Sequence, residues 1–300
     1  MAVVCVGQSA YDIVIPYEGV LTENQKYRVE DRLECGGGPA MNAAYLCALW
    51  GEETSLISRI GEDEYGKKLK NILREVGVDT DCLVEEDGIE TPYSIILSNK
   101  ANGARTIFNF PGKIRYQTYT YPEIDVSVIL SDGHLPELSI GAIKKYSSAV
   151  SVLDAGTCRE STMEVAPFAD YIVCSEDFAR QYTGKAVDLE KPELCREIFD
   201  RIKSINQKQA VITLGEKGLL YEHNQELKHL PAYPAKAVDT SGAGDIFHGA
   251  FAFGLARKMS LPDILKLSSM ASSISVESLG GQSSIPELSL AERKLKEQER

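Results

Sequence analysis

The chain has 300 residues, 43% of them hydrophobic, which is enough to bury the core of one large α/β domain or of two smaller ones. The formal net charge of −12 argues against a nucleic-acid partner, because binding nucleic acid requires a basic surface. The seven cysteines are odd in number and widely spaced, and no Cys-x-x-Cys occurs, so neither a disulfide framework nor a zinc site is expected.

The N-terminus lacks the features of a targeting segment. Residues 1–7 have neither the basic start nor the longer apolar run of a secretory signal. No apolar segment reaches the ~18 residues that a membrane-spanning helix needs. We therefore expect a cytoplasmic protein without a membrane partner.

The first third of the chain alternates short apolar runs with polar segments. Residues 3–6 form a continuous apolar run that ends at Gly7, which is typical of a strand buried on both faces of a parallel sheet. The hydrophobic pattern also predicts strands at 11–15 and 54–57, helices at 40–50 and 63–76, and a polar, charged segment at 16–33. Two strands at 93–97 and 105–110 flank a loop with Asn99, Asn102 and Gly103, which is typical of a hairpin.

From residue 127 onward, strand and helix patterns follow one another, which favours βαβ units and a parallel sheet. The predicted segments are 127–130, 138–146, 149–153, 171–174, 191–203 and 210–213. Two later helices are predicted at 245–257 and 261–278. The charged run at 291–300 is predicted to be a solvated helix or tail.

The most informative motif is Asp-Thr-Ser-Gly-Ala-Gly-Asp at residues 239–245, which opens an apolar helix. Gly242 and Gly244 permit a tight turn that brings N–H groups close to a bound anion, and the helix start adds partial positive charge. Asp245 lies in the first turn, where a carboxylate could take a proton from an attacking hydroxyl. The motif predicts an anion cradle at Gly242, Ala243 and Gly244 with Asp245 as base, as phosphoryl transfer requires, although an ordinary helix cap is the alternative.

A second glycine cluster, Gly-Gly-Gly-Pro-Ala-Met-Asn-Ala-Ala at residues 36–44, also leads into an apolar segment. Together the two motifs resemble the two signatures of the PfkB-type, or ribokinase-like, family of sugar and nucleoside kinases. The resemblance runs over nearly the whole chain, and it also includes Gly7, Asp12 and the stretches 61–66, 213–218 and 280–286.

The resemblance implies an α/β fold with a three-layer α/β/α ribokinase-like core, a mostly parallel sheet and a small β lid. The core would comprise residues 1–12, 36–91 and 115–300, and the lid residues 13–35 and 92–114. In many relatives two lids pair, so a homodimer is implied here, and the exposed edge strands of such a lid would need cover.

The resemblance also implies the sugar site. Asp12, Gly37, Gly38 and Asn42 match sugar-holding positions, and Asp132 falls loosely where relatives place an acidic contact on the floor of the site. A carboxylate accepts hydrogen bonds from hydroxyls, and an asparagine amide both donates and accepts. The alternatives are a turn residue for Asp12 and a helix cap for Asn42.

Two further sets of residues match the nucleotide loop and a cation site. The nucleotide-loop residues are Thr213, Gly215 and Gly218. In potassium-activated relatives a monovalent cation lies beside the cradle, and hard oxygen atoms suit K⁺. The matching residues are Asp239, Ser241, Ser275, Ser278, Gly280 and Ser284, and a hydrogen-bonded turn is the alternative.

One stretch departs from the family pattern. Relatives commonly carry an Asn-x-x-Glu motif that orders magnesium-bound water, whereas this chain has Ser175 and Phe178 at those positions. Glu176 or Asp177 would have to order this water in place of the missing glutamate, from a position one or two residues earlier in the sequence. Some ketose kinases lack the motif too, which favours a ketose or modified hexose over ribose.

The pattern as a whole predicts an ATP-dependent sugar kinase that phosphorylates a primary hydroxyl, with Mg²⁺ and possible K⁺ activation. The first alternative is a nucleoside kinase, which would need an aromatic sandwich, for example from Tyr27, Phe108 and Phe110. The second is a non-catalytic sugar-binding homologue, which the intact Asp245 disfavours. A Rossmann dehydrogenase is rejected because Phe247 occupies the last glycine position of Gly-x-Gly-x-x-Gly, and no Walker motif occurs.

Overall fold

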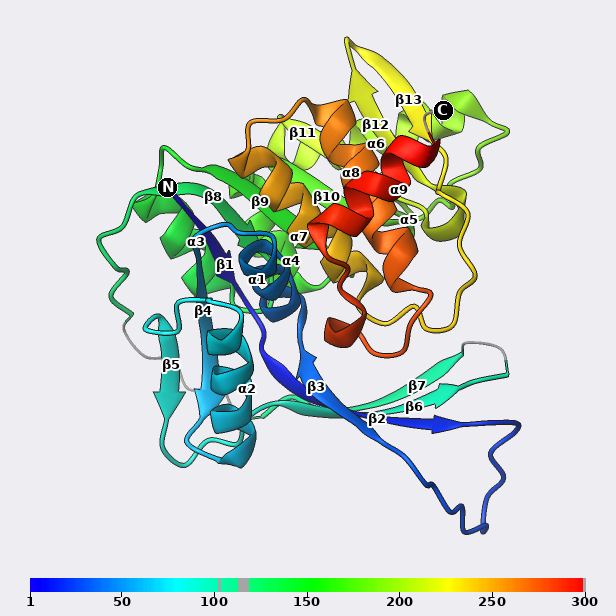
Figure 1. Ribbon diagram of the computed structural model, residues 1–300. Coiled ribbons are helices and arrows are strands. Elements are labelled where there is room, and N and C mark those ends of the chain that lie inside the picture. The colour runs from blue at the N-terminus through cyan, green and yellow to red at the C-terminus, as the bar shows by residue number, and fades with distance from the viewer. Residues whose placement is uncertain (102–103, 113–118, 299–300) are drawn as a thin grey trace.

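The computed structural model describes residues 1–101, 104–112 and 119–298. The described chain forms a large sheet covered by helices on both faces and a small sheet that projects from one end of it (Figure 1). Asn102 and Gly103, part of the expected hairpin loop, lie outside the described residues.

The large sheet has nine strands in the order β13-β12-β11-β10-β9-β8-β1-β4-β5. All neighbours pair in parallel except β11–β12 and β12–β13, which are antiparallel. The strands are β1 (Ala2–Val6), β4 (Thr54–Gly61), β5 (Leu83–Glu86), β8 (Val126–Ser131), β9 (Val150–Ala155), β10 (Tyr171–Ser175), β11 (Gln209–Thr213), β12 (Leu219–His223) and β13 (Glu226–Leu230). The mostly parallel sheet expected from the alternating pattern is confirmed.

Both faces of this sheet are buried, which explains why β1 is a continuous apolar run. Val3 and Cys5 belong to the core on one face, and Val4 and Val6 to the core on the other. The first face carries α1 (Pro39–Leu49), α2 (Glu64–Glu75), α7 (Ala243–Ala256), α8 (Leu261–Ser275) and α9 (Leu288–Gln298). The second carries α3 (Pro136–Lys145), α4 (Glu160–Val165), α5 (Glu176–Thr183) and α6 (Pro192–Asn206). The expected three-layer architecture is therefore confirmed.

The small sheet has the order β3-β2-β6-β7. Its strands are β2 (Ala10–Tyr17), β3 (Leu33–Gly37), β6 (Tyr93–Asn99) and β7 (Arg105–Phe110). Its register separates two sets of side chains, because successive residues of a strand face opposite sides. One face, called here the inner face, carries Asp12, Ser94 and Asn109; the outer face carries Tyr93 and Phe110, whose rings stack at 4.3 Å.

The charged run expected to be a solvated helix or tail is a helix over its described residues, but one face of it packs on the core. Helix α9 lies along α8, and Ala291 is completely buried. Its apolar side chains, such as Leu288 and Leu295, pack against the core cluster, while the charged residues lie between them. The many charged residues in this stretch obscured the helical spacing of its apolar residues in the sequence. Within the described residues, no helix combines the length and apolar character needed to cross a membrane.

Candidate active site

The N-termini of α1 and α7 meet at the carboxyl ends of the central strands. Gly38 caps α1 with φ of 92°, and Gly242 caps α7 with φ of 72°, both in the region that favours glycine. The helices pack closely, because a Cβ added to Gly249 in α7 would lie 3.0 Å from the Cα of Ala43 in α1. The two glycine motifs, which are about two hundred residues apart in the sequence, therefore form one site.

Asn42 and Asp245 join these helices directly. The Asn42 amide donates a hydrogen bond of 2.7 Å to Oδ2 of Asp245. The other atom of that amide, the buried Oδ1, has no hydrogen-bond partner in the described chain. Burial raises the pKa of Asp245, and the hydrogen bond from Asn42 and the positive charges of His248 and Arg105 partly oppose the rise. The site thus holds a carboxylate poised to accept a proton beside an unsatisfied acceptor.

Asp12 lies against the first glycine motif. A Cβ on Gly37 would come within 2.1 Å of the Asp12 carboxylate, so only glycine leaves room for it. Burial raises the pKa of Asp12 to about 6, the hydrogen bond with Ser94 lowers it, and the charge of Asp245 raises it further. The structure therefore brings the predicted Asp12, Gly37, Gly38, Asn42 and Asp245 together.

Asp132 faces backbone groups. Its carboxylate is 1% exposed and accepts hydrogen bonds from the backbone N–H groups of Gln8, Ala40 and His134 at 2.7, 3.2 and 2.9 Å. These bonds tie the loop after β1 and the start of α1 to the end of β8. Its position suits a residue that supports the floor of the site and does not reach into it.

A cavity of about 140 Å³ adjoins the cradle. The predicted nucleotide-loop residues Thr213, Gly215 and Gly218 line it on one side, and Ala243 and Gly244 line it on another. The loop bends at a 3₁₀ turn over Gly215–Lys217. The structure thus brings the expected nucleotide loop and the expected anion cradle to one cavity.

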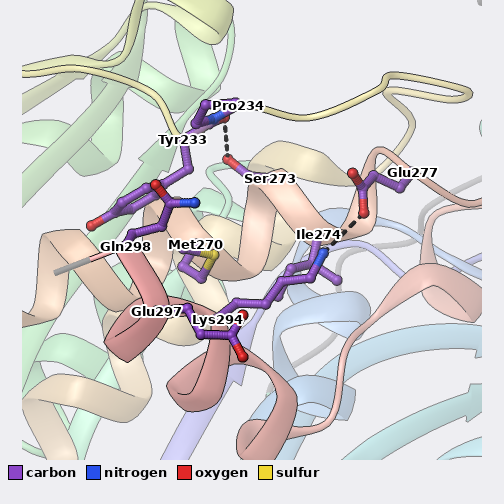
Figure 2. A pocket seen from close by; sticks show the side chains of 9 residues that line it. All are labelled: Tyr233, Pro234, Met270, Ser273, Ile274, Glu277, Lys294, Glu297 and Gln298. Atoms are coloured by element: carbon purple, nitrogen blue, oxygen red, sulfur yellow. Dashed lines mark hydrogen bonds and ion pairs between the residues drawn. The ribbon is translucent and has the colours of Figure 1, made fainter. Parts of the chain in front are cut away.

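A second cavity lies between α8, α9 and the segment at Tyr233 and Pro234 (Figure 2). Three of its polar side chains are engaged: Lys294 pairs with Glu277 at 3.1 Å, and Ser273 donates to the carbonyl oxygen of Tyr233 at 3.2 Å. The cradle glycines are not among its lining residues, so this cavity is separate from the one that adjoins the cradle.

The residues of the expected cation site lie in two adjoining segments: the loop before α7, and the stretch from the end of α8 through a short 3₁₀ helix at Gln282–Ser284. Asp239 is buried and accepts hydrogen bonds from the backbone N–H groups of Ser241 at 2.9 Å and Gly280 at 3.0 Å. The segments touch, since a Cβ on Gly242 would lie 2.8 Å from the Cα of Gly281. The remaining predicted residues are Ser275, Ser278 and Ser284, and the hydroxyls of Ser275 and Ser284 donate to nearby carbonyl oxygens.

The stretch that departs from the family pattern has a structural role. Ser175 caps α5 by accepting a hydrogen bond of 3.0 Å from the N–H of Phe178, whose side chain is fully buried. Glu176 pairs with Lys217 of the nucleotide loop at 2.9 Å, and Asp177 pairs with Arg180 at 2.7 Å. Of the two proposed substitutes, only Glu176 is linked to the nucleotide loop.

Sequence reasoning missed three residues at this site. His248 and Asp154 form a buried pair beneath the cradle, and Arg105 of β7 donates to the hydroxyls of Thr240 at 3.2 Å and Ser241 at 3.3 Å. Asp154 ends an ordinary apolar strand pattern, and His248 is part of an apolar helix. Only their contact in the folded protein marks these two residues as special. Arg105 is different, because it is the single charged residue of its strand, and the sequence alone could have marked it as a candidate site residue.

The fold is that of the ribokinase-like kinases. The crystal structure of an Agrobacterium tumefaciens protein assigned as a candidate ribokinase superposes with a TM-score of 0.88 at 26% identity, covering 100% of this chain and 99% of that one. The structure of Arabidopsis thaliana ribokinase complexed with ribose and ATP has the same fold, with a TM-score of 0.79 at 22% identity and 98% coverage of both chains.

The sequence comparison is equally extensive. The ribokinase of Lactococcus lactis subsp. lactis (strain IL1403) is 29% identical over 305 residues, which cover 98% of this chain and 97% of that protein. The family model for pfkB family carbohydrate kinases matches residues 2–288, and the chain belongs to this family. The expected family, fold and enzyme class, a carbohydrate kinase, are therefore confirmed.

Proposed function

We propose that this protein is an ATP-dependent sugar kinase in which Asp245 accepts the proton of a primary sugar hydroxyl. The observation that carries the proposal is the 2.7 Å hydrogen bond from Asn42 to Asp245 at the first turn of α7, next to the cradle glycines. Burial raises the pKa of Asp245, which makes its carboxylate a stronger base than that of an ordinary aspartate.

The start of α7 would stabilise the transferring phosphoryl group. The first N–H groups of a helix have no intrahelical acceptor, and here they adjoin the cavity lined by Ala243 and Gly244. Donors that are already in place when negative charge develops cost no reorganisation during the reaction. Glu176, which pairs with Lys217 of the nucleotide loop, is the carboxylate we propose to help hold magnesium, an ion that would supply positive charge to neutralise the ATP phosphates.

The inner face of the small sheet supports sugar binding. Asp12, Ser94 and Asn109 form a polar row across three strands, and the unpaired Oδ1 of Asn42 needs a donor that a sugar hydroxyl could supply. A site built from such groups rejects a ligand that leaves them unpaired. Arg105 links this sheet to the loop before α7, which supports a role for the small sheet as a lid over the sugar.

The nucleoside-kinase alternative receives less support. Phe110 stacks on Tyr93 of the outer face, and the register places Phe108 on the same face, opposite to Asp12. Tyr27 lies in the exposed segment between β2 and β3, where its hydroxyl accepts a hydrogen bond from the N–H of Thr22. These aromatic rings are thus not arranged around the site as a base-binding sandwich.

We further propose a potassium site and a dimer interface. The Asp239 loop and the facing loop at Ser278 and Gly280 offer oxygen atoms that suit K⁺, which we expect to raise activity. The outer face of the small sheet exposes 53% of Phe108 and 41% of Phe110, and we propose that a second copy of the chain covers it. Sedimentation velocity would measure the assembly, and K⁺ titration the activation.

The test is ADP release with ATP, Mg²⁺ and K⁺ against aldoses, ketoses, sugar phosphates and nucleosides. One sugar should be turned over, and Asp245→Asn should lower kcat by roughly 10²–10⁴-fold because the base is lost. The matched control is Asp263→Asn, which removes an exposed carboxylate from the first turn of α8. Full activity of Asp245→Asn would exclude the base role, and turnover of nucleosides alone would favour the alternative.

A further inference from the structure

A buried histidine lies one turn into α7, beneath the proposed phosphoryl site. His248 is 4% exposed. Its Nδ1 lies 2.6 Å from the carbonyl oxygen of Gly244 and 3.2 Å from Oδ2 of Asp154, and its Nε2 lies 3.0 Å from the carbonyl oxygen of Val173. Asp154 is the next-to-last residue of β9 and is 7% exposed. Both side chains are therefore held in fixed surroundings away from water.

These contacts determine the charge of the ring. A carbonyl oxygen only accepts hydrogen bonds, so both nitrogens of His248 must donate. A neutral ring would aim a lone pair at one of the carbonyl oxygens, and a buried unsatisfied group of that kind is costly. His248 is thus an imidazolium, and the adjacent Asp154 carboxylate supplies the opposite charge that a buried cation requires.

The charge state of Asp154 agrees with this pairing. Burial raises the pKa of Asp154 to about 6; the charge of His248 lowers it, and those of Asp245 and Asp132 raise it. The carboxylate is therefore ionised at pH 7.5. His134, which contacts Asp132, is the other titratable ring at this edge of the sheet, and Arg159 lies against it.

The contact with Gly244 links the pair to the cradle. The carbonyl group of Gly244 and the N–H of Asp245 belong to one planar trans peptide group, in which they point in opposite directions. A hydrogen bond from His248 to the carbonyl therefore orients the N–H at the start of α7. The imidazolium also adds positive charge behind a helix terminus that is already suited to bind anions.

We infer that Asp154 and His248 are positioning residues: their ion pair holds the Gly244–Asp245 peptide group and places a positive charge beneath the transferring phosphoryl group. This inference rests on the proposed kinase function for its catalytic consequence. The pair touches neither ATP nor sugar in this role. It acts through the backbone of α7, so it should affect kcat more than the KM of either substrate.

The first experiment measures ring protonation by ¹⁵N NMR of the full-length protein without ligands. The chain has four histidines, and His248→Asn assigns the signal. We expect both ring nitrogens of His248 to be protonated at pH 7.5 and the second proton to be lost at that pH in Asp154→Asn. A neutral His248 ring in the wild-type protein would overturn the inference.

The second experiment measures function in His248→Gln and Asp154→Asn. We expect kcat to fall about 10–100-fold with less than about a threefold change in either KM, as for loss of a preorganised anion donor. His223→Gln, at the end of β12, is the control. Unchanged kcat in folded His248→Gln would overturn the inference.

The two proposals fail separately. If no sugar is turned over by the wild-type protein, the proposed function fails. The pair is then judged by the ring protonation and by the backbone amide signal of Asp245 on addition of Mg²⁺ and ATP. That signal should shift less in His248→Gln than in His223→Gln, and equal shifts would count against the positioning role.

Discussion

Asp12 and Asp245 are two half-buried acids that share one site, and the charge of Asp245 makes Asp12 harder to ionise. The charge of Asp245 contributes to the raised pKa of Asp12, and burial is the larger cause for both. A base must be deprotonated to act, so activity should fall as the pH drops through the pKa values of the pair. These values lie above the ordinary aspartate value, because both shifts are upward.

The pH dependence of kcat/KM provides the first check. We expect an acid limb near pH 6, where Asp12 protonates, well above the ordinary carboxyl value of about 3.9. The profile should be measured in buffers of constant ionic strength. A rate that stays constant down to pH 4.5 would contradict the coupled acidic site.

The contribution of Asp12 to the stability of the fold should have the opposite pH dependence to the activity. The folded protein binds a proton more tightly than the unfolded chain, so this contribution to stability is full below the unfolded pKa and is lost as the pH rises through about 6. We therefore compare the change in the free energy of unfolding that Asp12→Asn causes at two pH values. This change should be more stabilising at pH 8 than at pH 4.5, by on the order of 1 kcal/mol. Urea denaturation at both values measures this, with Asp31→Asn in the exposed loop as the control.

At the scale of elements, α5 shows how a helix start can keep its structural function while its sequence departs from the family. Ser175 retains the cap, and Phe178 turns inward to pack with the core of the second face, which includes Phe199 of α6. The position that relatives commonly give to a glutamate is therefore core in this chain. In the function proposed above, a residue that holds magnesium-bound water would have to come from elsewhere, and Glu176 is adjacent in the sequence.

Restoring the usual motif should fail for this reason. Phe178→Glu should destabilise the protein by at least about 4 kcal/mol, because it removes a buried ring and buries an unpaired carboxylate. Ser175→Asn is the matched variant, since asparagine caps helices as well as serine does, and it should change stability by less than about 0.5 kcal/mol. Thermal unfolding compares them; a stable Phe178→Glu protein would show that α5 can rotate.

At the scale of the whole molecule, the site depends on the contact between α1 and α7. The closest approach is at Gly249, whose added Cβ would meet the backbone of Ala43 at 3.0 Å. This approach sets the distance between Asn42 and Asp245. A change more than one helical turn away from the cradle can therefore alter the chemistry, because close-packed interiors transmit small displacements.

Gly249→Ala should lower kcat about tenfold by pushing the helices apart and lengthening the contact between Asn42 and Asp245. Gly254→Ala is the control, because its Cβ would meet the side chain of Ile264 in α8 and leave α1 undisturbed. Both variants should lose some thermal stability, but only the first should lose turnover. Equal loss of kcat in both would mean that stability alone governs activity.

The sequence by itself determined the features that depend on local patterns. Continuous apolar runs identified buried parallel strands, and the glycine motifs at 36–44 and 239–245 identified the family and the two helix starts that form the site. These signals are local because burial on two faces and a turn with positive φ each restrict a few neighbouring residues.

Only the tertiary structure decided which distant residues meet. Strand register placed Asp12 and Phe108 on opposite faces of the small sheet, packing turned Asp132 toward the backbone, and the sheet order brought Asp154 to His248. None of these has a local signature, because an aspartate at a strand end has the same pattern whether it faces a ligand or a carbonyl group. Burial, register and helix contacts decide between these outcomes.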